Sequence, residues 1–226
     1  MVIRFPARHE VPKFSVFASL LRMTTKYGFT NVRDQLVKDL ECAYPTKWET
    51  YQAAEVLGED LFGSPKPHPN AVLNLFVAQN VRFAIPFAAY RASLGGFLAL
   101  MSDKSGTLLS RHTLASTIYG MERTRGLMAH AAHTIAYTKK LPHCPDSACV
   151  LNVGTKHAER RIEALTKLHD LMIIERKGGV LDIPSLGNLT CAKCAKETEA
   201  HHVTWRRACW ELLPTAFSVA NCWDEV

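Results

Sequence analysis

The sequence lacks the short motifs by which many enzymes are identified. In its 226 residues there is no GxSxG nucleophile elbow, no GxxxxGKS/T phosphate loop, no GxGxxG turn and no HExxH zinc pair. His130 and His133 lie three residues apart without a third ligand, so we interpret them as surface histidines. We predict that the chain is not an enzyme. A thiol hydrolase is the remaining catalytic alternative, because its cysteine and histidine need not be close in sequence.

The sequence also lacks a long apolar run. The nearest approach, residues 85–101, is interrupted by Arg91, and a membrane helix needs about eighteen or more apolar residues. The first residues, MVIRFP, do not show the basic segment followed by an apolar block that is typical of a secretory signal. We therefore expect no membrane span and an intracellular location, either cytoplasmic or nuclear.

Two close cysteine pairs are the sharpest local feature of the chain. Cys144/Cys149 and Cys191/Cys194 are separated by 41 residues, and the total of seven cysteines is odd. In a reducing compartment thiols persist, so disulfides are the weaker interpretation. Structural zinc is held by four ligands at tetrahedral corners, which two short pairs can supply. We predict a structural zinc site with these four cysteines as ligands.

Other interpretations of the thiols stay open. Cysteines with apolar neighbours often behave as small buried hydrophobic groups, and Pro145 lies inside the first pair. Imidazole can replace a thiolate, so the alternative ligands are His143, His201 and His202. The remaining cysteines lack a close partner and are predicted to be core residues; they are Cys42, Cys209 and Cys222.

The formal net charge of +6 is unevenly distributed. Residues 1–60 carry eight basic and eight acidic side chains, whereas residues 104–161 carry nine basic and three acidic ones. The second stretch suits an acidic partner or a phosphate backbone, or it is a solvated helical surface. A basic nucleic-acid-associated module is therefore an alternative function, although no groove-reading motif is present.

Helical periodicity runs through most of the chain. Gly28 is predicted to end the first helix, Asn31 to cap the second, and Thr46 to open the third with Glu49 three residues later. The clearest predicted helices span residues 14–27, 113–140, 156–176 and 190–212. The apolar face predicted on the first helix consists of Phe14, Phe17, Leu20, Leu21, Thr24 and Tyr27.

Prolines and glycines punctuate this pattern. Pro69 and Pro86 suit the first turns of two more helices, and Gly95-Gly96 is predicted to break the chain between helices. Residues 63–69 contain three prolines at alternating positions, which cannot continue a helix. We predict an all-α fold, an irregular multi-helix bundle, with a domain at residues 1–62 and a second helical domain at residues 69–226.

The segment FSVFASLLRMTTKYGFTNVRDQLVKDLECAYP, residues 14–45, resembles the last helical part of a BTB (POZ) domain. An Ala-Tyr-Pro boundary before Trp48, the Cys191/Cys194 pair and the sequence WELLP at residues 210–214 resemble the tail of BTB-domain proteins of basidiomycete fungi. The resemblance implies a protein–protein interaction protein, an adaptor or scaffold, to which the cysteine spacing adds the structural zinc site predicted above. It also implies that the front of the BTB domain, roughly eighty residues, is missing.

If that front part is missing, the hairpin at residues 14–45 should expose apolar surface and self-associate or bind a protein partner. The four tryptophans are candidate partner anchors, although core positions are the more frequent role. They are Trp48, Trp205, Trp210 and Trp223. We expect no small-molecule substrate.

Overall fold

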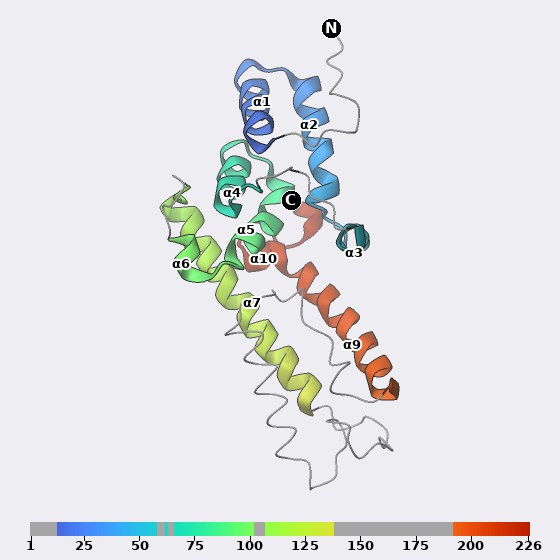
Figure 1. Cartoon of the computed structure of the whole chain (residues 1–226). Helices are drawn as coiled ribbons and strands as arrows, with labels where there is room; N and C mark the ends of the chain where they lie inside the picture. Colours follow the sequence, from blue (N-terminus) through green and yellow to red (C-terminus); the bar gives the residue numbers. More distant parts are fainter. Residues whose placement is uncertain (1–12, 58–61, 63–65, 102–106, 138–191) are drawn as a thin grey trace.

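The computed structural model describes residues 13–57, 62, 66–101, 107–137 and 192–226. These residues form nine α-helices and two 3-10 turns, and no strand occurs among them (Figure 1). The predicted all-α class is therefore confirmed for this part of the chain. The helices are α1 (Phe14–Tyr27), α2 (Thr30–Ala43), α3 (Trp48–Leu57), α4 (Pro69–Ala78), α5 (Ile85–Ser93), α6 (Gly96–Leu100), α7 (Arg111–Tyr137), α9 (Ala192–Glu211) and α10 (Leu213–Ala216), and the 3-10 turns are η1 (Arg82–Ala84) and η4 (Trp223–Glu225).

The α1–α2 hairpin forms as predicted. Gly28 adopts the left-handed conformation, with φ of 68°, and its N–H donates to the Thr24 carbonyl at the end of α1. Phe29 N–H donates to the same carbonyl at 2.9 Å, so two bonds close the helix end. α1 buries one face against the rest of the protein, with Phe17, Ala18, Leu21 and Thr24 in the core.

Two predicted helix starts are wrong. α2 begins at Thr30, so Asn31 lies in the first turn and does not cap it. The turn at Gly28 is tight, with Thr30 N–H donating to the Gly28 carbonyl at 2.9 Å, and helix therefore resumes at once. α3 begins at Trp48, two residues after Thr46. Tyr51 N–H donates to the Lys47 carbonyl at 3.1 Å, which places Lys47 rather than Thr46 at the N-cap position. The Thr46 carbonyl accepts a tertiary bond from Trp210 Nε1 at 3.3 Å.

The predicted proline and glycine positions are confirmed. Pro69 occupies the first turn of α4, which follows His68, whose Nδ1 accepts the Asn70 N–H at 3.3 Å. Pro86 lies in the first turn of α5. Gly96, the first residue of α6, has φ of 73°, a conformation that side chains disfavour, and the chain breaks between α5 and α6 at Gly95-Gly96 as predicted.

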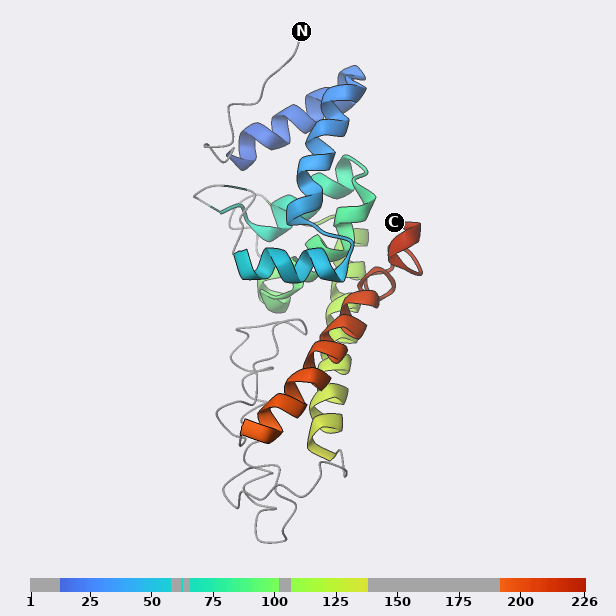
Figure 2. The same cartoon turned by 90° about the vertical axis from the view of Figure 1, so that its right-hand side faces the viewer.

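α7 is the longest described helix and runs beside α9 (Figures 1 and 2). It begins two residues before the predicted Thr113, because the Ser110 hydroxyl accepts the Thr113 N–H at 3.2 Å and caps the helix start. α9 begins at Ala192 and ends at Glu211, close to its predicted bounds. The predicted helix at residues 156–176 lies outside the described residues.

One buried apolar cluster connects the helices from α1 to α10. Phe62 contacts Phe17 edge to face, with ring centroids 5.4 Å apart, and Tyr51 contacts Phe87 of α5 at 5.6 Å. The second contact joins the two predicted domains across the proline-rich segment. The domain boundary stays a prediction. None of the helices in the described part of the chain combines the length and apolar character that crossing a membrane requires.

Candidate functional site

Most of the predicted zinc ligands lie outside the described residues. This holds for Cys144, Cys149 and Cys191. Cys194 lies in the first turn of α9, where its side chain is not described. Within the described ranges, no three Cys, His, Asp or Glu side chains form a group that could hold a metal ion. The zinc site therefore stays a prediction.

The side chains of the histidines considered as alternative ligands, and those of His130 and His133, are not described either. His143 lies outside the described residues, and His201 and His202 lie on α9 with side chains that are not described. His130 and His133 lie on the last turns of α7, where side chains are likewise not described. Their interpretation as surface histidines stays a prediction.

The two described thiols have opposite environments. Cys209 is buried, as predicted, and burial raises its thiol pKa from 9.0 to about 12. A thiol with so high a pKa stays protonated and is a poor nucleophile. Cys222 is exposed, so its predicted core position is wrong: it lies in an extended conformation between α10 and η4, beyond the helices that form the core. The Cys42 side chain is not described.

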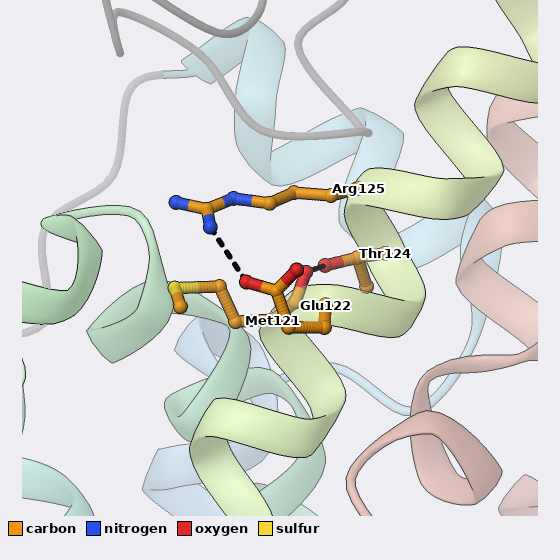
Figure 3. A network of polar contacts seen from close by, with 4 residues as sticks. All are labelled: Met121, Glu122, Thr124 and Arg125. Atoms are coloured by element: carbon orange, nitrogen blue, oxygen red, sulfur yellow. Dashed lines mark hydrogen bonds and ion pairs between the residues drawn. The ribbon is translucent and has the colours of Figure 1, made fainter.

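Two arginines of the basic stretch already bond within the protein. Arg123 donates to the Thr215 carbonyl at 3.0 Å and lies over the Tyr119 ring at 5.7 Å. It thereby ties α7 to α10. Arg125 pairs with Glu122 at 2.6 Å one turn earlier, and the Thr124 hydroxyl donates to the Met121 carbonyl at 2.9 Å (Figure 3). Both charges of that ion pair are substantially exposed, so it contributes little stability.

The remaining basic residues of this stretch are placed as follows. Arg111 is exposed at the start of α7. The others lie outside the described residues; they are Lys104, Lys139, Lys140, Lys156, Arg160 and Arg161. The structure thus describes only a part of the surface on which the nucleic-acid alternative depends.

Trp210 lies at the centre of an aromatic cluster that joins distant parts of the chain. It is fully buried and stacks between Tyr51, at 4.8 Å, and Trp223, at 5.0 Å. Phe87 of α5 is 5.4 Å away and Trp48 of α3 is 6.3 Å away. Trp223 Nε1 donates to the Trp210 carbonyl at 2.9 Å, which fixes the C-terminal turn η4 to α9. We call these five residues the Trp210 cluster.

The core interpretation is confirmed for two of the four tryptophans. Trp48 and Trp210 are buried, with 3% and 0% of their surface exposed. Trp205 and Trp223 are half-buried and pack against the core. The guanidinium of Arg206 lies over the Trp48 ring at 5.4 Å, so an α9 side chain also contacts Trp48 of α3.

A row of apolar side chains on the outer side of α1 is exposed. Val16, Met23 and Tyr27 are 51%, 52% and 59% exposed, and Leu20 between them is half-buried. Phe29, just beyond Gly28, is 57% exposed and its ring lies 6.3 Å from that of Tyr27. We call these five residues the α1 stripe. Tyr27 was predicted to face the core and this prediction is wrong, because Tyr27 lies in line with Val16 and Met23 on the outer side of α1, away from the buried row of Phe17, Leu21 and Thr24.

A second exposed apolar group lies at α6 and the start of the following segment. Leu98 is the most exposed large apolar residue in the described part of the chain, and Phe97, Met101 and Leu108 are about half exposed. The polypeptide between Met101 and Thr107 is not described. The described part of this group thus ends at a segment whose contacts with it are not described.

Comparison of the chain with models of known protein families, with curated proteins and with solved structures found no match.

Proposed function

We propose that this chain is a non-enzymatic protein–protein interaction protein that binds a partner through the α1 stripe. It serves as an adaptor or scaffold and resembles the C-terminal portion of a fungal BTB-domain protein, in which α1 and α2 are the last BTB-like helices. The single observation that carries the proposal is the exposure of four large apolar side chains along the outer side of α1 and the turn that follows it. An apolar patch of this kind on a folded protein is typical of a binding site.

Two observations support the absence of catalysis. Motifs of the common hydrolases and nucleotide-binding enzymes are lacking from the sequence. The buried Cys209 thiol has a raised pKa, so it is unsuited to nucleophilic attack. Binding rather than chemistry is the function we infer.

Site-specific photocrosslinking in the cells that make the protein tests this function. A photoreactive phenylalanine analogue replaces Met23 in one variant and Leu98 in another, because both side chains are exposed on helices. We expect a discrete crosslinked protein from position 23 that is absent from position 98. Equal products from both positions, or none from position 23, would overturn the proposal.

We also propose that a structural zinc ion is held by Cys144, Cys149, Cys191 and Cys194. Elemental analysis of the purified chain tests this ligand set. One zinc per chain is expected, with loss of the metal in a Cys191→Ser/Cys194→Ser variant, whereas Cys222→Ser, which changes an exposed thiol, should retain it. Metal-free wild-type protein would show that the pairs are not a zinc site.

A further inference from the structure

We infer that the α1 stripe binds an amphipathic helix whose apolar face is flanked by acidic residues. This inference rests on the proposed function and specifies the partner. Its first support is spacing: residues 16, 20, 23 and 27 follow steps of four, three and four, which place them along one line of α1. A partner helix laid along this line contacts it over about 16 Å, or three turns.

The second support is charge. The segment from Lys13 to Phe29 contains three basic side chains, Lys13, Arg22 and Lys26, and no acidic one. All three are exposed. Within the described part of the chain, none of them forms an ion pair with a carboxylate, and Lys26 lies over the Tyr27 ring at 5.2 Å. The stripe therefore has a positive border, which attracts and orients an acidic helix.

The same charges disfavour a second copy of this chain as the occupant. A two-fold symmetric contact through α1 would bring identical basic borders together, because each surface meets its own copy. The chain as a whole is also basic, with a formal charge of +6. The first twelve residues contain two arginines and one glutamate, so they do not supply an acidic occupant either.

An anionic membrane is the other surface that a basic, apolar helix could bind. Spacing favours a helical protein partner. The line is one residue wide, since α1 buries Phe17, Leu21 and Thr24 on its adjacent face. A membrane-surface helix instead presents a broad apolar face to the lipid. Binding to anionic vesicles is measured as well, to test the membrane alternative.

The test uses the full chain and two designed helical peptides with identical leucine stripes. One peptide has glutamate and the other lysine at the positions flanking the leucines. Fluorescence anisotropy should show that the glutamate peptide binds about tenfold or more tightly than the lysine peptide, with an affinity that falls as salt increases. Met23→Ser/Tyr27→Ser should reduce binding at least tenfold. Leu98→Ser, an equivalent change on exposed α6, should leave binding unchanged.

Other outcomes would overturn the acidic partner, the assignment to α1 or the helical partner. Equal binding of both peptides through the stripe overturns the acidic partner and leaves the interaction function intact. Binding that is lost in Leu98→Ser but kept in the stripe variant overturns the assignment to α1, as does the absence of binding by either peptide. Stripe-dependent sedimentation with phosphatidylserine vesicles, or a stripe-dependent dimer in sedimentation velocity, overturns the helical partner in favour of a membrane or a second copy.

Discussion

The Trp210 cluster and the α1 stripe are both built from large apolar side chains, but they have different surroundings. Rings of the Trp210 cluster come from α3, α5, α9 and η4, and the other four ring centroids lie 4.8–6.3 Å from that of Trp210. The stripe comes from one helix and the residue after its cap, and its side chains are about half exposed. Large apolar residues of this chain are therefore buried where several helices converge, and they stay exposed where only one helix presents them.

Replacement of Trp210 should give the largest effect on stability. Trp210→Ala removes the central ring of the cluster and leaves a cavity, so we expect a loss of about 3–5 kcal/mol in the free energy of unfolding. Phe29→Ala is the matched control from the stripe and should change stability by less than about 0.5 kcal/mol. Urea denaturation of the two variants measures both. Similar losses would show that the two regions do not differ as described.

If Trp210→Ala is insoluble, Trp210→Phe provides the same comparison. It retains an aromatic ring but removes the Nε1 donor to the Thr46 carbonyl. A smaller loss, of about 1–3 kcal/mol, is expected.

Two glycines of α7 should respond to alanine in opposite directions. A Cβ atom at Gly120 would lie 2.7 Å from Cγ of Phe217 and closer still to two other ring atoms, so Gly120→Ala should destabilise by about 1–3 kcal/mol. At Gly126 nothing lies within 4 Å, so Gly126→Ala should stabilise by up to about 1 kcal/mol through helix propensity. Thermal unfolding measures both. Destabilisation of similar size at both sites would contradict the packing of α7 on α10.

The pH dependence of stability should report the burial of Cys209. Its thiol pKa is about 12 in the folded chain against 9.0 ordinarily, so the unfolded chain releases this proton first as pH rises. The stability contributed by the neutral thiol is complete below pH 9 and declines above it, by about 1.4 kcal/mol per pH unit up to pH 12. Cys209→Ala should lack this component when urea midpoints are compared at pH 8 and pH 10. Parallel curves for wild type and variant would contradict the burial.

The smallest stability effect is expected from the stripe itself. Met23→Ser/Tyr27→Ser should lower the free energy of unfolding by less than about 1 kcal/mol, because both side chains are already mostly in water. Circular dichroism during thermal unfolding measures this. A loss comparable with that of Trp210→Ala would mean that the stripe belongs to the core.

Local signals predicted much of the fold. Periodicity and the Gly28 cap gave α1 with its observed bounds, and Pro69 and Pro86 marked the starts of α4 and α5. The predicted starts at Asn31 and Thr46 are wrong because the tight turn after Gly28 lets α2 begin at Thr30, and because the Lys47 carbonyl, one residue after Thr46, accepts the Tyr51 N–H of α3. Capping patterns compare residues no more than about four positions apart, so they do not reveal how the backbone turns before a helix begins.

The candidate site was only partly predictable. The α1 stripe is consistent with the expected exposure of apolar surface on residues 14–45. Tyr27, however, was assigned to the core, because the exposed row of residues 16, 20, 23 and 27 lies next to the buried row of residues 17, 21 and 24 on the same helix. Which of two neighbouring apolar rows is buried depends on where α2 crosses α1. The residues next to Gly120 likewise carry no sign that this glycine makes room for the Phe217 ring, which comes from a distant segment.

The position at which the glutamate-flanked peptide binds the chain distinguishes the α1 stripe from the other exposed surfaces. A photoreactive residue at the central apolar position of the peptide is crosslinked to the wild-type chain, and the products are located by mass spectrometry. A binding site on the α1 stripe predicts crosslinks within residues 16–29, on the exposed side of α1 and at Phe29. Crosslinks confined to residues 96–108 or 205–226 would contradict it and place the binding surface elsewhere on the molecule.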